Sequence, residues 1–195
     1  MLRKQLESIM QIQDCHISGL KVIQLEIHGD SRGFFVERFN EKKFAAAGLP
    51  TRFVQDNHSR SAAGILRGLH FQNNPAQGKL VGVTQGRVWD VAVDIRPESK
   101  TFGQHFGVEL SAENGKLLWI SAGFAHGFCV LGDAPADMLY KVTEFYNAAG
   151  EGGIAYDDAQ LAINWPIENP TISERDRQLA SWDEYCKNIR QEEKA

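Results

Sequence analysis

The chain has 195 residues, of which 43% are hydrophobic and 24% are charged, a balance typical of a soluble chain that buries its core as one domain. The formal net charge of −4 argues against a general binder of nucleic acid or of membrane surfaces, because such proteins present a net basic face. The three cysteines, Cys15, Cys129 and Cys186, stand far apart and lack C-x-x-C spacing. They indicate neither a disulfide framework nor a zinc site, and they favour a reducing compartment.

Residues 1–15 are interrupted by charged and amide side chains and contain no continuous apolar stretch like that of a signal peptide. No later apolar run is long enough to span a bilayer. The sequence therefore predicts a cytoplasmic protein without a membrane segment. Residues 3–13 have the spacing of a short amphipathic helix, and we expect residues 1–18 to be an N-terminal extension of a single domain that covers residues 1–195.

The first regular elements are expected to form a β-hairpin. Residues 20–27 alternate apolar and polar side chains, as a half-buried strand does, and the turn-like residues 28–31 separate them from a second strand at 33–39. Residues 41–47 have a helical pattern, which the following glycine and proline end.

Short strand-like runs then recur, broken by Gly, Asn, Asp and Pro. This regular spacing favours an antiparallel sandwich or barrel over alternating β and α units. After them the pattern becomes helical from residue 173 to residue 190, with Ser173 as the predicted N-cap. The predicted strands cover residues 53–57, 65–71, 79–84, 87–95, 107–110, 117–120, 127–131 and 138–145.

Residues 55–79, QDNHSRSAAGILRGLHFQNNPAQGK, form the densest group of ionisable and polar side chains in an apolar frame. Arg67 and His70 are three positions apart, so in a regular strand they would point to opposite faces. Gly68 lies between them, and a glycine within a strand often marks a bulge that redirects the following side chains. We expect such a bulge to place both side chains in one cavity, and we expect the Arg67 guanidinium to need a counter-charge there.

The segments QDNHS, LRGLHFQ, QGKL, DVAVDIR, TFG, LSAEN, GFAHGF and LYK occur in this order between about residue 30 and residue 176. In content and separation they resemble the dTDP-4-dehydrorhamnose 3,5-epimerase family. The resemblance implies a mostly β, cupin-type jelly roll with short peripheral and C-terminal helices. It also implies that the protein inverts C3 and C5 of a dTDP-linked 4-keto-6-deoxyhexose without a cofactor. Finally, it implies a homodimer in which the N-terminal strands cross to the neighbouring subunit.

Inversion of a carbon next to a ketone needs a base on one face, an acid on the other, and a group that stabilises the enolate. The resemblance implies that His70 is the base, with Asp176 as its partner carboxylate, and that Tyr140 is the acid. Lys79 is expected on the strand after His70, where its ammonium group would stabilise the enolate. Each residue also has a structural interpretation: a hydrogen-bonded core histidine, a carboxylate at a helix N-terminus, a packed tyrosine and a solvated lysine.

Substrate binding in an acidic protein needs local positive charge, and arginine offers paired donors to a diphosphate. Arg32 and Arg67 are the candidates for this role, and Phe34 or Phe35 could stack on the base. His126 is expected to pair with Asp90, and Arg175 stands where the family has a lysine. The further residues that the resemblance or their chemistry points to are Glu37, Gln55, Asp56, Asn57, Tyr146 and Glu151.

Other nucleotide and metal sites leave characteristic patterns that this sequence lacks. The His-x-His pair of metal-binding cupins is missing, because Phe71 and Gln72 follow His70, and we therefore predict no metal. Neither a phosphate-binding P-loop nor a Rossmann glycine pattern is found. An epimerase acting at C3 alone, a ketoisomerase on the same scaffold, and a non-catalytic jelly roll that binds a nucleotide sugar remain alternatives.

Overall fold

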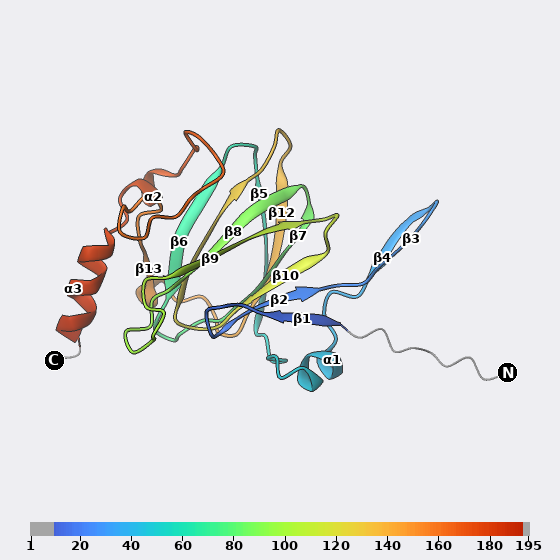
Figure 1. The fold of residues 1–195 in the computed structure, drawn as a ribbon, viewed down its shortest axis with the longest axis horizontal. Helices are drawn as coiled ribbons and strands as arrows, with labels where there is room; N and C mark the ends of the chain where they lie inside the picture. Colours follow the sequence, from blue (N-terminus) through green and yellow to red (C-terminus); the bar gives the residue numbers. More distant parts are fainter. Residues whose placement is uncertain (1–9, 193–195) are drawn as a thin grey trace.

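A computed structural model describes residues 10–192, which form two antiparallel β-sheets packed face to face and a separate two-stranded hairpin (Figure 1). The six-stranded sheet has the order β1 (Gln11–Asp14), β2 (Leu20–Gln24), β10 (Lys116–Ile120), β7 (Lys79–Gln85), β12 (Ala136–Val142) and β5 (Gln55–Ser61). The five-stranded sheet has the order β13 (Glu151–Gly153), β6 (Leu66–Gln72), β11 (Phe124–Val130), β8 (Arg87–Asp94) and β9 (His105–Ser111). The prediction of a mostly β jelly roll is confirmed.

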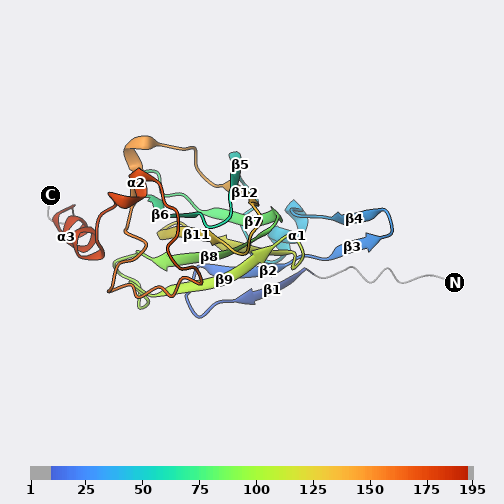
Figure 2. The ribbon, with the colours of Figure 1, turned by 90° about the horizontal axis from the view of Figure 1, so that it is seen from above.

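The main core lies between the two sheets, whose strands Figure 2 shows from above. Strands that are covered on one face alternate apolar and polar side chains, and this is why short alternating runs in the sequence predicted them. β2 contributes Leu20 and Val22, β7 contributes Val81 and Val83, and β8 contributes Val88. These side chains are at most 7% exposed, so the two apolar faces are fully covered.

The C-terminal part of the chain covers the outer face of the five-stranded sheet. α2 (Glu174–Arg177) begins with Ser173 as its N-cap, as predicted. α3 (Trp182–Glu192) packs Trp182 and Tyr185 against a second core on this sheet, and the Tyr185 hydroxyl donates to the carbonyl oxygen of Ile95 at 3.0 Å. The prediction of a single helix over residues 173–190 is therefore wrong between α2 and α3. There the chain is not helical, and Ala180 forms a β-bridge with Ile154.

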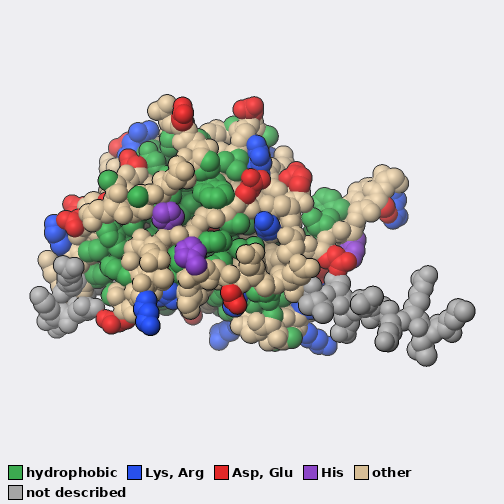
Figure 3. Space-filling view, viewed as in Figure 1, with side chains coloured by type: hydrophobic (Ala, Val, Ile, Leu, Met, Phe, Trp, Pro, Cys, Tyr) green, Lys and Arg blue, Asp and Glu red, His purple; other side chains and the backbone are tan. Residues whose placement is uncertain are grey.

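The predicted hairpin exists, but its strands are shorter than expected and the first lies further along the chain. β3 (Ile27–Asp30) pairs with β4 (Gly33–Val36), whereas residues 20–24 belong to the body of the six-stranded sheet. The chain leaves that sheet after Leu25, whose N–H donates to the carbonyl oxygen of Gly115. The hairpin stands clear of the sandwich (Figure 3). Arg32 lies at its tip, between the paired residues Asp30 and Gly33.

The remaining differences concern boundaries and the N-terminus. α1 (Glu41–Ala46) and the 3₁₀ helix η1 (Ala148–Gly150) are short and peripheral, and α1 was predicted within one residue. The helix predicted for residues 3–13 is wrong where it can be compared, because residues 11–14 form strand β1, and residues 3–9 lie outside the described part of the chain. Two predicted strands, 53–57 and 138–145, are displaced by two or more residues.

Candidate active site

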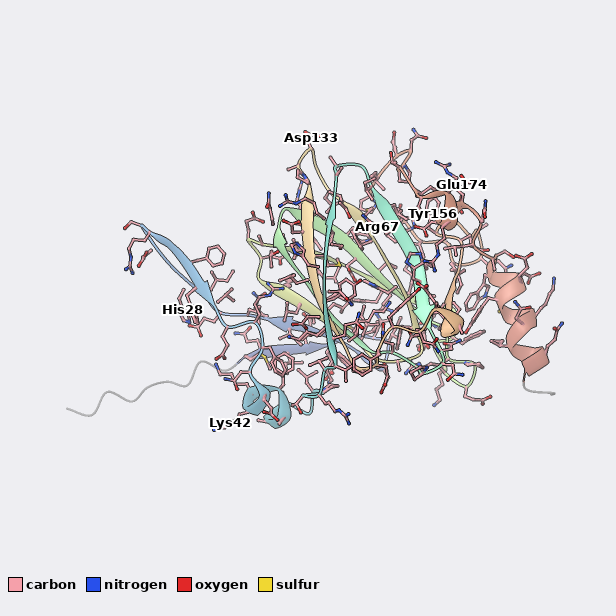
Figure 4. The ribbon with its side chains drawn as sticks, turned by 180° about the vertical axis from the view of Figure 1, so that it is seen from behind. His28, Lys42, Arg67, Asp133, Tyr156 and Glu174 are labelled. Carbon is pink, nitrogen blue, oxygen red and sulfur yellow. The ribbon has the colours of Figure 1, made fainter. Side chains whose placement is uncertain are left out.

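A cavity of about 190 Å³ opens between the two sheets and contains polar side chains from both. β6 and β11 of the five-stranded sheet face β5, β7 and β12 of the other sheet there. Figure 4 shows this part of the molecule with its side chains, among them Arg67 on β6. The residues that line the cavity are Ser59, Arg67, His70, Lys79, His126, Gly127, Phe128, Met138 and Tyr140.

A bulge at Gly68 explains how Arg67 and His70 reach the same cavity. The register between β6 and β11 shifts between His126 and Phe128, opposite this glycine. Gly68 has φ +110°, and a Cβ atom there would lie 2.6 Å from the Gly127 Cα atom. Only glycine accepts this backbone conformation and this close approach. The predicted bulge and the shared cavity are confirmed.

His70 and Asp176 form a hydrogen-bonded pair at the cavity wall. Nε2 of His70 lies 2.7 Å from Oδ1 of Asp176, and the N–H of Gly68 donates to Oδ2 of the same carboxylate at 3.3 Å. Asp176 is buried in the first turn of α2, which orients it towards β6. Burial lowers the pKa of His70 below its ordinary value, although Asp176 acts in the opposite direction. The imidazole is therefore neutral at neutral pH, which is the form that accepts a proton.

Tyr140 and Lys79 line the same cavity from the six-stranded sheet. Burial raises the pKa of Tyr140, so its phenol keeps its proton and can donate it. The Lys79 Nζ atom donates to the carbonyl oxygen of His70 at 3.4 Å. Burial lowers the pKa of Lys79 to about 8, while the carboxylates of Asp90 and Glu151 favour its charged form. The ammonium group thus predominates at neutral pH inside the cavity.

A second histidine and carboxylate pair lies beside the first. His126 is the strand partner of His70, and its Nε2 atom is 2.9 Å from both carboxylate oxygens of Asp90. Both residues are buried, so the carboxylate fixes the imidazole ring in one orientation. The pairing predicted for His126 is confirmed.

Three of the predicted binding residues meet one another at a different edge of β6. Glu151 lies opposite Gln72 in the β13–β6 pairing, and its carboxylate accepts a hydrogen bond from the Tyr146 hydroxyl at 2.8 Å. The Arg175 guanidinium pairs with the same carboxylate at 2.7 Å. Glu151 acts electrostatically on His70, Lys79 and Tyr140, which places this group next to the cavity.

The residues of β5 divide between the two faces of the sheet. Asn57 is the strand partner of Tyr140, and Gln55, whose Nε2 donates to Asn57 Oδ1, lies on the same face. Asp56 is the partner of Lys141 and forms an ion pair with it at 2.9 Å. Since alternate residues of a strand face opposite sides, Asp56 points away from His70 and Tyr140.

Arg32 and Glu37 are not brought to this cavity within one chain. Arg32 is exposed at the hairpin tip and pairs with Asp30, and Glu37 pairs with Lys43 at 2.8 Å. The counter-charge expected for Arg67 is also not found in residues 10–192. Its guanidinium donates to Ser61 Oγ at 2.9 Å and to the carbonyl oxygen of Arg60 at 3.4 Å, and the side chain is exposed at the cavity, where an anion can reach it.

Sequence reasoning missed Ser59, Met138 and Phe128 as parts of the cavity wall. For Ser59 a signal existed, because it continues the alternation that places Gln55 and Asn57 on the inner face of β5. Phe128 and Met138 carry no polar group that would have distinguished them from core residues. Residues 10–192 contain no cluster of three or more His, Cys, Asp or Glu side chains able to hold a metal ion. No helix in this part of the chain has the length and apolar character needed to cross a membrane.

Comparisons with known proteins identify close relatives. The profile of the family described as dTDP-4-dehydrorhamnose 3,5-epimerase matches residues 14–184. An enzyme of that name from Pseudomonas aeruginosa is 55% identical over 83% of this chain and 90% of its own. A crystal structure of a dTDP-6-deoxy-D-glucose-3,5-epimerase from Legionella pneumophila, with dTDP-4-keto-L-rhamnose bound, is 50% identical. It covers 89% of this chain and 93% of its own, with a TM-score of 0.85.

A relative from Streptomyces niveus with a narrower name, dTDP-4-dehydrorhamnose 3-epimerase, is less similar. It is 37% identical over 86% of this chain and 82% of its own. The profile match covers most of the chain, and the identity to enzymes with the broader name is about one half. The chain therefore belongs to the dTDP-4-dehydrorhamnose 3,5-epimerase family.

Proposed function

We propose that this protein is an epimerase that converts dTDP-4-dehydro-6-deoxy-D-glucose into dTDP-4-dehydro-L-rhamnose by inverting C3 and C5. The observation that carries the proposal is that His70 and Tyr140 line one cavity from two facing sheets. A planar enolate held between them would have a base on one face and a proton donor on the other. Family membership and the higher identity to 3,5-epimerases than to the 3-epimerase support this reaction.

The mechanism follows from the protonation states of these groups. Neutral His70 removes the proton from C3, and Asp176 stabilises the imidazolium that forms. The C4 carbonyl oxygen becomes an enolate oxygen, whose charge the Lys79 ammonium group stabilises in a partly buried site. Tyr140 then gives its proton to C3 from the opposite face. Exchange with solvent restores both groups, and the same cycle at C5 completes the reaction.

The guanidinium of Arg67 is our candidate for binding the diphosphate, because no carboxylate among the described residues 10–192 forms an ion pair with this charged donor at the cavity. The Tyr146, Glu151 and Arg175 group, together with His126, Gln55 and Asn57, would surround the rest of the ligand. Asp56 would influence substrate binding only indirectly, through Gln55 and Asn57. Its own carboxylate lies on the opposite face of the sheet, where it pairs with Lys141.

The substrate site is completed, in our proposal, by a second copy of the chain. The β3–β4 hairpin stands away from the sandwich and exposes 65% of Phe34 and 67% of Phe35. An isolated two-stranded hairpin with exposed aromatic side chains gains stability by packing against another surface. In a twofold dimer, Arg32 and Glu37 of one chain would reach the neighbouring cavity, which would explain their position far from their own.

Complementation tests the dimer proposal. Arg32→Ala and His70→Asn, each nearly inactive alone, are co-expressed with different tags, and the heterodimer is purified. If Arg32 acts across the dimer, one of the two sites has both residues intact, and about half of the normal activity returns. A heterodimer no more active than the mean of the two homodimers, or a monomer with full activity, would rule this arrangement out.

The reaction itself is tested in deuterated water. With dTDP-4-keto-6-deoxyglucose and no added metal or nicotinamide, we expect deuterium at both C3 and C5 by NMR. Label at C3 alone would assign the narrower 3-epimerase activity. Binding of the nucleotide sugar without any label would identify a non-catalytic binding protein, and a change in the position of the keto group would identify a ketoisomerase.

A further inference from the structure

Gln72 is the last residue of β6, two positions after His70, and its side chain is buried. Its Nε2 atom donates to the carbonyl oxygens of Pro75 at 2.8 Å and of Phe145 at 3.1 Å. Its Oε1 atom accepts from the backbone N–H of Asn147 at 2.9 Å. Both amide hydrogens and the carbonyl oxygen are therefore used, and one buried side chain connects the end of β6 to two loops.

The second of these loops carries Tyr146. The two bonds from Gln72 hold the residues immediately before and after it, and the Tyr146 N–H donates to Gln55 Oε1 at 3.3 Å. Residues 143–147 belong to no helix or strand, so side-chain amides replace the missing ladder hydrogen bonds at this point. The Tyr146 hydroxyl, at the end of a side chain carried by this loop, donates to Glu151 at 2.8 Å.

The two loops are also bonded to each other. The N–H of Asn73 donates to the carbonyl oxygen of Gly150 at 2.9 Å, and Nδ2 of Asn147 donates to the carbonyl oxygen of Asn74 at 2.7 Å. The strand partner of Gln72 in β13 is Glu151 itself. Gln72 therefore lies at the position where β6, the loop after it, and the chain from Phe145 to Glu151 meet.

We propose that Gln72 is a positioning residue that holds Tyr146 and Glu151 beside the cavity, and that it acts on substrate binding through them and not on His70. The identity of the ligand in this inference rests on the proposed function. Glutamine is required because a glutamate would direct a carboxylate at two carbonyl oxygens. An apolar residue would remove the hydrogen bonds of three backbone groups, the carbonyl oxygens of Pro75 and Phe145 and the N–H of Asn147.

Gln72→Met keeps the length of the side chain and removes its hydrogen bonds. We expect the Kd for dTDP and the KM for the keto sugar to rise about tenfold, with kcat within about threefold of normal. Gln77→Met is the matched control, because the Gln77 amide bonds the same loop at the carbonyl oxygen of Glu144, whereas the bonds to the residues on either side of Tyr146 come from Gln72. Its Kd and KM should stay within about twofold of normal.

A double-mutant cycle with Tyr146→Ala separates positioning from general stability. If Gln72 acts through Tyr146, Gln72→Met should add less than about twofold to the Kd in the Tyr146→Ala background. Fully additive effects of Gln72→Met and Tyr146→Ala on the Kd would overturn the inference. A lower melting temperature together with a lower kcat and an unchanged KM would also overturn it. If Gln72→Met does not fold, Gln72→Glu, which keeps the acceptor for the N–H of Asn147, serves instead with the same expected rise in Kd. Absence of label exchange by the unmodified protein contradicts the proposed function, whereas an unchanged Kd in the variants contradicts the role of Gln72.

Discussion

His70 Nε2 lies 2.7 Å from Asp176 Oδ1, although 106 positions separate the two residues in the chain. The contact exists because α2 docks its first turn against β6, where the N–H of Gly68 binds the second carboxylate oxygen. The carboxylate is buried, so its hydrogen bond to the imidazole is not weakened by competition with water. The base proposed for the reaction is thus oriented from a helix that follows the jelly roll.

Asp176→Asn tests this relationship. The amide preserves the shape of the side chain, but it presents a hydrogen-bond donor or an uncharged oxygen to Nε2 and cannot stabilise the imidazolium. We expect kcat for label exchange to fall by about 10² or more, in the range that general base catalysis contributes. Isothermal titration should give a Kd for dTDP close to normal. A kcat within about threefold of normal would show that the carboxylate has only a structural role.

The pH dependence of kcat/KM should have two limbs with different origins. On the acid side the rate should fall as His70 becomes protonated, at a pH below the ordinary histidine value of about 6.5, because burial lowers this pKa. On the alkaline side the rate should fall near pH 8, where Lys79 loses its charge. The pKa of Tyr140 lies above its ordinary value of 10, so this residue does not produce the second limb.

Lys79→Arg distinguishes the source of the alkaline limb. A guanidinium stays protonated across this range, so we expect a lower maximal rate but no decline near pH 8. The acid limb should remain where it is in the unmodified protein. An alkaline limb that persists unchanged in the variant would assign it to a group other than Lys79.

Gly68→Ala should be far more harmful than a substitution at another glycine with positive φ. Gly64 has φ +76°, and a Cβ atom added to it would have no neighbour within 4 Å, whereas at Gly68 the added atom meets Gly127 and the carbonyl oxygen of His126. We expect Gly68→Ala to lower the free energy of unfolding by about 1 to 3 kcal/mol more than Gly64→Ala, as overpacking does. Denaturant titration measures both, and equal losses would contradict the close packing of the bulge.

Arg67→Met should weaken dTDP binding, and Arg60→Met provides a matched control. Arg60 lies on the same part of the molecule, but its guanidinium is neutralised by Asp137 at 2.6 Å. We expect the Kd for dTDP to rise about tenfold or more for Arg67→Met and less than about twofold for Arg60→Met. The affinity of the unmodified protein should also decrease more steeply with added salt than that of Arg67→Met. Equal effects of the two substitutions would remove Arg67 from the binding site.

The fold was predictable where one face of a strand is covered, because burial on one side imposes alternation on the sequence. It was less predictable where a distant segment decides the local structure. The break between α2 and α3 arises because the carbonyl oxygen of Ala180 accepts a hydrogen bond from the N–H of Ala155 at 2.8 Å, which no helical pattern reveals. The division between β2 and β3 likewise depends on the pairing of β2 with β10.

The site was predictable to the extent that chemistry and the resemblance select residue types. His70, Lys79 and Tyr140 were chosen for their acid and base properties, and they line one cavity. Asp56 was grouped with Gln55 and Asn57 because they are adjacent in sequence, but strand alternation separates it from them. In the sequence, Gln72 served only to exclude a His-x-His metal site. Its hydrogen bonds could not be predicted, because its three partners lie in two loops about 70 residues apart that meet only in the folded chain.

Two-sided proton transfer is tested most directly by following solvent exchange and inversion separately in His70→Asn and Tyr140→Phe. In deuterated water, His70→Asn should show neither label at C3 nor an inverted product, because no base remains on that face. Tyr140→Phe should still exchange the C3 hydrogen through His70 but return deuterium to the same face, giving label without inversion. Normal inversion by Tyr140→Phe, or continued exchange by His70→Asn, would contradict the assignment of His70 as base and Tyr140 as acid.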